Sequence, residues 1–126
     1  MKQIKIDLTR FRGNQSTLFT GRPQGLDARN ELGLDDIDKQ NDIEVLFIVP
    51  NGTTSFNPSF YLGLLYHSCE NLGVELFNSK YKFQMQTTDE ATKKVLEKNL
   101  EDGKRNAINE VTKKTGLWQF IKQKNR

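Results

Sequence analysis

Apolar and polar residues follow two different spacings along the chain, and these spacings predict strands and helices in turn. Ile4, Ile6 and Leu8 are separated by polar residues, and this period of two is typical of a half-buried strand. A glycine-containing turn follows, and residues 17–20 are predicted to form a second short strand. We expect these two neighbouring strands to pair as a hairpin.

A continuous apolar segment at residues 43–49 predicts the central strand. The segment is rich in β-branched residues and apolar on both faces, as expected for a strand inside a sheet. Asn57 and Pro58 then open a helix that runs to about Leu72, because asparagine is a preferred N-cap and proline favours the first helical position. This helix is unusually apolar, so we expect it to pack across the sheet.

Three further segments complete the predicted order of elements. Pro23 and Gly33 mark the start and end of a short helix. Residues 81–85 alternate as a strand, and residues 88–114 have the spacing of a long amphipathic helix that Gly116 ends. Strands that alternate with helices predict an α/β fold with a mixed central sheet and helices packed on it.

The length and the charge distribution fit one such domain. The chain has 126 residues and a net charge of +3, with 28% charged residues. Residues 112–126 contain five basic residues and no acidic residue. We therefore place the α/β domain at residues 1–116 and a basic C-terminal tail at residues 117–126.

An acidic segment lies between the short helix and the central strand. It lacks the glycine and the final glutamate of a calcium-binding loop, so we expect a solvated connector. Its acidic residues are Asp35, Asp36, Asp38, Asp42 and Glu44.

Residue counts exclude several classes of function. The single histidine, His67, and the single cysteine, Cys69, cannot build a Cys/His zinc site. No Gly-x-Ser-x-Gly elbow accompanies the histidine, and no apolar run approaches the length of a membrane span. The N-terminus also lacks the apolar region of a signal peptide. We expect a cytoplasmic, non-enzymatic binding module without a catalytic residue, metal or cofactor.

Several segments, in their order along the chain, resemble those of a known family over residues 18–110. These stretches are 19–22 (FTGR), 47–50 (FIVP), 57–60 (NPSF), 62–65 (LGLL), 72–73 (LG), 80–83 (KYKF) and 99–103 (NLEDG). The order is similar to that of the bacterial STAS-like domains of unknown function, which are distantly similar to anti-sigma-factor antagonists. The resemblance implies a single-domain STAS-like fold.

The resemblance also implies a regulatory function. In anti-sigma-factor antagonists, a kinase-like anti-sigma factor phosphorylates a serine at the start of this helix, and Ser59 falls on that position. It therefore implies a protein-binding module that switches partners with a kinase-like ATPase through Ser59. Asn57 and Phe60 replace the acid and the glycine of the usual Asp-Ser-Ser-Gly sequence. From the residues alone, Ser59 can also be read as part of the helix cap.

Polar residues near Ser59 define a candidate partner or ligand surface. The hydroxyl-rich loop follows the central strand, at the end where ligands prefer to bind in open α/β sheets. An arginine just before a helix start can also hold an anion. The residues of this surface are Arg22, Thr53, Thr54, Ser55, Asn57 and Phe60. A second function therefore stays open: the chain is a small-ligand or nucleotide-binding protein, including one that acts in phage–host conflict. The alternative for this segment is a polar loop without a ligand.

The basic tail carries two aromatic residues, Trp118 and Phe120. We expect them to dock on the sheet and close the core. The alternative is an anchor for a partner, because tryptophan is enriched at binding hot spots. Weak nucleic-acid binding through the tail is a third function, although the rest of the chain has no basic stripe that favours it. The oligomeric state is left open.

Overall fold

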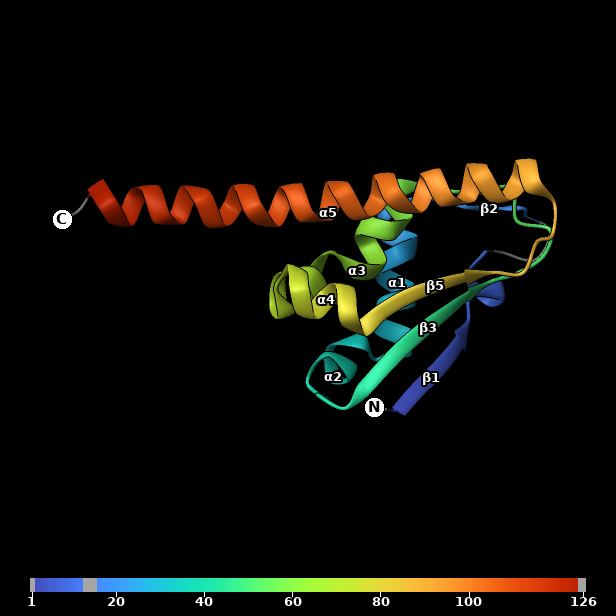
Figure 1. Ribbon diagram of the computed structural model, residues 1–126, viewed down its shortest axis with the longest axis horizontal. Coiled ribbons are helices and arrows are strands. Elements are labelled where there is room, and N and C mark those ends of the chain that lie inside the picture. Colours follow the sequence, from blue (N-terminus) through green and yellow to red (C-terminus); the bar gives the residue numbers. More distant parts are fainter. Residues whose placement is uncertain (1, 13–15, 125–126) are drawn as a thin grey trace.

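The computed structural model describes residues 2–12 and 16–124, with side chains up to residue 114 (Figure 1). Three parallel strands form the main sheet in the order β1-β3-β5. They are β1 (Lys2–Asp7), β3 (Ile43–Val49) and β5 (Tyr81–Met85). Val45 of β3 lies between Ile4 and Tyr81 of the two neighbours. The α/β class and the central position of residues 43–49 are confirmed. The expected mixed sheet is not found among these strands, which are all parallel because helices connect each strand to the next.

The helices cover one face of this sheet (Figure 1). Successive right-handed crossovers in one direction place every connecting helix on the same side. Val45, Phe47 and Val49 point into the core and are buried, whereas Leu46 and Ile48 on the other face are only partly buried. Although β3 is apolar on both faces, helices cover only one of these faces among the described elements.

Two helices cross at the centre of the core. Helix α1 (Arg22–Leu32) has proline in its first turn and ends at Gly33, whose φ of 68° is left-handed. Helix α3 (Pro58–Leu72) is the apolar helix predicted from the sequence, and it packs against α1 and against the long helix α5 (Glu90–Lys124). The predicted start and end of α1 and the predicted start of α3 are confirmed.

The predicted hairpin is wrong. Strand β2 (Leu18–Phe19) pairs in parallel with β4 (Ser55–Phe56), and the two form a small separate sheet. The rings of Phe19 and Phe56 lie 4.9 Å apart, and both contact the ring of Phe60. Burial of these three rings favours a distant partner for β2 over its neighbour in the sequence.

The remaining helices differ in part from the prediction. The acidic segment begins with a short helix, α2 (Leu34–Asp38), and α4 (Val74–Lys80) precedes β5. Helix α5 continues through Gly116, so its predicted end is wrong, and Figure 1 shows its C-terminal part extending past the other elements. A glycine costs a helix only about 1 kcal/mol, which is too little to end a long one. None of the helices described is long and apolar enough to cross a membrane.

Candidate functional site

Ser59 lies at the start of α3 with an exposed side chain. The side-chain oxygen of Asn57 accepts a hydrogen bond from the Ser59 amide at 2.8 Å, so Asn57 is the N-cap as predicted. The cap uses the backbone of Ser59, and no hydrogen bond of its hydroxyl is recorded among the residues described. The hydroxyl is therefore accessible to a modifying enzyme or a partner.

The hydroxyl groups of the loop after β3 hold the loop in place. Thr53 is buried, and its hydroxyl accepts a hydrogen bond from Nη1 of Arg12 at 2.8 Å. Arg12 also donates to the carbonyl oxygen of Asn51 at 3.1 Å. Thr54 is exposed, and its hydroxyl lies 2.8 Å from that of Thr17. Thr53 is thus unavailable to a ligand.

Ser55 is tied to α5 rather than to Ser59. Its hydroxyl lies 3.4 Å from the side-chain oxygen of Asn99, which also accepts the Phe56 amide at 2.9 Å. The asparagine in the sequence NLEDG therefore joins α5 to β4.

Arg22 does not reach this loop. Its guanidinium lies 5.4 Å from the ring centre of Tyr66 and 3.5 Å from the Glu110 carboxylate. Arg22 therefore links α1 to α3 and α5, and Arg12 is the arginine that orders the loop. Phe60 is fully buried in the core, so its predicted place on the contact surface is wrong. The cause is its position on the inward face of α3, which it shares with the buried Leu64.

The expected docking of Trp118 and Phe120 falls on side chains outside the described residues. Their backbone belongs to the continuous helix α5.

A buried polar cluster was missed by the sequence analysis. Arg29 is 1% exposed, and its guanidinium donates to Asp38 at 2.9 Å and to the Ser68 hydroxyl at 2.7 Å. The Ser68 hydroxyl in turn donates to Asp38 at 2.9 Å, and the Tyr81 hydroxyl donates to the other carboxylate oxygen. We call these four residues the Asp38 cluster. They join α1, α2, α3 and β5.

The Asp38 cluster corrects the expectation of a solvated acidic connector. Asp38 is 5% exposed and is paired, because a carboxylate is tolerated in a core only with a cation and hydrogen bonds. In the sequence, Asp38 looks like the exposed acidic residues around it. Arg29 lies on the buried face of α1 with Gly25 and Ala28, whereas Leu26 of the same helix is exposed, so the apolar spacing of α1 does not reveal the pair.

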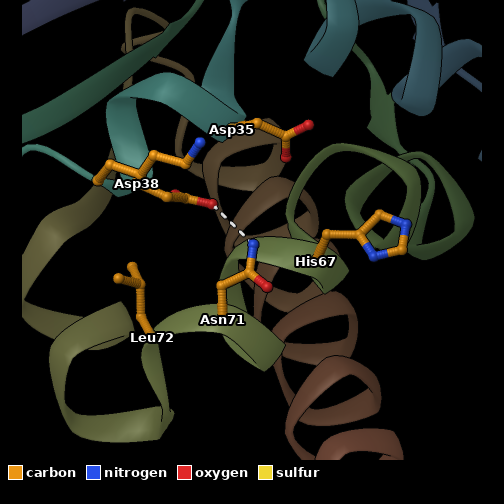
Figure 2. Close-up of a pocket in the computed structure, with 6 residues that line it drawn as sticks. Asp35, Asp38, His67, Asn71 and Leu72 are labelled. Carbon is orange, nitrogen blue, oxygen red and sulfur yellow. Dashed lines mark hydrogen bonds between the residues drawn. The ribbon is translucent and has the colours of Figure 1, made fainter.

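An open groove of about 620 Å³ lies beside the Asp38 cluster, between α2 and α3. It is lined by Asp35, Asp38, Lys39, His67, Asn71 and Leu72. In Figure 2, Asp35 and His67 lie to one side of Asn71, and Leu72 lies to its other side. The side chain of His67 is 52% exposed and lines this groove.

The groove presents charges of both signs. A hydrogen bond of 2.6 Å from Arg29, together with its positive charge, lowers the pKa of Asp35 and keeps that carboxylate ionised. The Asn71 amide lies 3.5 Å from Asp38. Among the residues described, no three side chains are grouped to hold a metal ion. The groove therefore suits a small polar molecule, with Asp35 as acceptor and Lys39 as donor.

Comparisons with protein-family models, curated proteins and solved structures find no match to this chain.

Proposed function

We propose that this chain is a non-enzymatic regulatory module that binds another protein, and that phosphorylation of Ser59 controls the binding. The exposed hydroxyl of Ser59 in the first turn of α3 is the observation that supports this most directly. Negative charge is favoured at a helix N-terminus. A phosphate adds about −1.5 to −2 charge there, which changes a contact surface while the helix stays folded.

The contact surface is smaller than the one expected from the sequence. Asn57, Thr54 and Ser59 are exposed, whereas Thr53 and Phe60 are buried. The proposed partner is a kinase-like ATPase, as the STAS-like resemblance implies. Such a partner reaches Ser59 across Thr54 and the capping residue.

The proposal is tested by recovery of the partner from the native host. Purified wild-type chain, Ser59→Asp and Ser59→Ala are used as bait, and bound proteins are quantified by mass spectrometry. We expect Ser59→Asp to lose a kinase-like ATPase that the other two retain. Ser79→Asp is the matched control, because Ser79 is an exposed serine within α4. Equal recovery by all baits removes Ser59 from the mechanism.

A second candidate function is the binding of a small polar ligand. The groove between α2 and α3 has a volume within the range of natural ligand sites, roughly 300–1,000 Å³. Its place differs from the ligand surface expected around Arg22 and the loop after β3. Titration with ATP and with free amino acids, followed by NMR of the His67 ring and the Asn71 side-chain amide, tests this function. Shifts confined to other residues, or no shifts, exclude these ligands from the groove.

A further inference from the structure

The outer edge of β5 has backbone groups that no described strand pairs with. Gln86 donates its amide to the carbonyl of Val49 at 3.0 Å. In a parallel pair, alternate residues turn both backbone groups to the same neighbour. Gln84 and Lys82, which are two and four residues before Gln86, therefore face β3. The backbone groups of Phe83 and Met85 face away from it.

No other element fills this edge in the part of the chain that the structure describes. The main sheet ends at β5, so no described strand pairs with the outward backbone groups of Phe83 and Met85. The amide of Tyr81, two residues before Phe83, already donates to the Phe77 carbonyl in α4. Helix α5 runs past β5 but makes its main contacts with α3 (Figure 1). The free groups thus lie two residues apart, at the repeat of a β-strand.

A groove of about 350 Å³ lies along this edge, between β5 and α5. Tyr61, Phe83 and Leu100 give it an apolar surface, and Glu101 and Lys104 add charges from α5. Asn78 also lines the groove, and its side-chain oxygen is buried without a hydrogen-bond partner. A buried acceptor of this kind is costly unless a donor reaches it.

We propose that the free edge of β5 binds an extended peptide segment of a partner protein, which adds a fourth strand to the main sheet beside α5. The peptide backbone pairs with Phe83 and Met85, as in other cases of strand addition. An apolar side chain of the peptide contacts Tyr61 and Leu100, and a peptide N–H donates to Asn78. This inference rests on the proposed protein-binding function but does not involve Ser59.

The geometry favours a single peptide strand over a second copy of the chain. Two β5 strands that paired antiparallel in one continuous sheet would bring both copies of α5 to the same face. Helix α5 already flanks the groove on that face. An extended segment has no covering helix of its own, so it enters without this conflict.

Amide hydrogen exchange tests the proposal on the full chain. The probe is a peptide selected from a random-peptide phage library on the immobilised protein and then synthesised. We expect it to slow exchange of the Phe83 and Met85 amides by about tenfold or more, because a bonded amide exchanges only after opening. Exchange at Lys82 and Gln84 stays unchanged, since these amides already face β3. Protection without this alternation, or protection at another edge, overturns the proposal.

A pair of variants tests the role of the edge directly. Met85→Pro removes one outward donor without removing a bond to β3, because proline is tolerated at the free side of an edge strand. We expect about tenfold weaker peptide binding, the effect of roughly one hydrogen bond. Met85→Leu keeps the amide and binds as wild type. If Met85→Pro does not fold, N-methylation of alternate peptide amides replaces it: loss of binding for one set only supports the proposal, and equal loss or no loss overturns it.

Two outcomes separate this inference from its alternatives. Protection of Phe83 and Met85 in the free chain that falls on dilution indicates pairing between two copies and overturns the peptide proposal. If Met85→Pro recovers the partner of the Ser59 experiment as well as wild type does, the edge is not its binding site, and the proposed function stands while this inference fails. Loss of partner with Met85→Pro but not with Met85→Leu supports it, whatever Ser59 does.

Discussion

Gly25 of α1 and Gly63 of α3 each lie against the backbone of the other helix where the two cross. A β-carbon at position 25 would lie 2.1 Å from the carbonyl oxygen of Phe60, and one at position 63 would lie 2.0 Å from that of Arg22. Both separations are far below any real contact, and both neighbours are backbone atoms. The two glycines therefore set how closely the helices approach.

Gly63→Ala should separate α1 from α3 and lower the free energy of unfolding by roughly 1–3 kcal/mol, the usual cost of overpacking. Urea denaturation measures the change. Asp27→Ala, at an exposed position of α1, is the control and should have little effect. Gly25→Ala and Gly63→Ala together should cost less than the sum of the two, because one displacement relieves both clashes. If the two losses of stability add fully, the two glycines do not act at one shared contact between α1 and α3.

Asp38→Ala should be far more destabilising than Asp35→Ala, although both carboxylates bind Arg29. Removing Asp38 leaves a buried guanidinium without its main partner, which costs about 3–5 kcal/mol. The Asp35 side chain is 68% exposed, so its loss should cost less than about 1 kcal/mol. Chemical denaturation of both variants measures the difference. Equal losses of stability in the two variants would show that the cost of removing a carboxylate here does not depend on its burial.

Stability should fall in alkaline solution because of Tyr81. Burial, aided by the hydrogen bond to Asp38, raises the pKa of Tyr81 above its ordinary value. The folded state therefore keeps the proton longer than the unfolded state, whose tyrosine titrates near about pH 10. The contribution is complete below that pH and is lost as the pH rises above it. Melting temperatures between pH 8 and pH 11 should show the fall. Tyr81→Phe should make the fall less steep without abolishing it, because burial also raises the pKa of Tyr61.

Asn57→Ala should destabilise the fold by about 1 kcal/mol, because the amide of Ser59 loses its cap. Ser59→Asp should leave stability unchanged or slightly raised, since an acid suits the first turn of a helix. Thermal denaturation checks both. A clear loss of stability in Ser59→Asp would mean that any loss of partner reflects unfolding rather than a switch.

The elements predicted correctly are those whose signals are local. The apolar run of β3, the cap at Asn57 and the alternation of β5 lie within the elements they define. Such patterns depend on backbone preference and on one buried face, which neighbouring residues specify. The burial of Phe60 could also have been inferred from the helical spacing along α3, although Phe60 was expected on the contact surface.

The features that sequence reasoning missed depend on distant partners. Leu18 pairs with Ser55 rather than with β1, because three aromatic rings from different elements bury one another. Asp38 looks solvated within its acidic run, and only the approach of Arg29 explains its burial. The sequence also does not show that β5 is an edge strand, because the pairing of all the strands decides which of them lie at an edge.

The Asp38 cluster has a consequence for how the molecule opens. Its hydrogen bonds connect residues 29, 38, 68 and 81, so four elements share one ion pair. Detaching any of them alone would strand a charge or a polar group in the core. Slow-exchanging amides of α1, α3 and β5 should therefore report one common opening free energy, as members of a single cooperative unit. Helix α5 contributes no residue to the cluster and is joined to this unit through packing on α3 and the exposed Arg22–Glu110 pair, so its amides are free to open earlier.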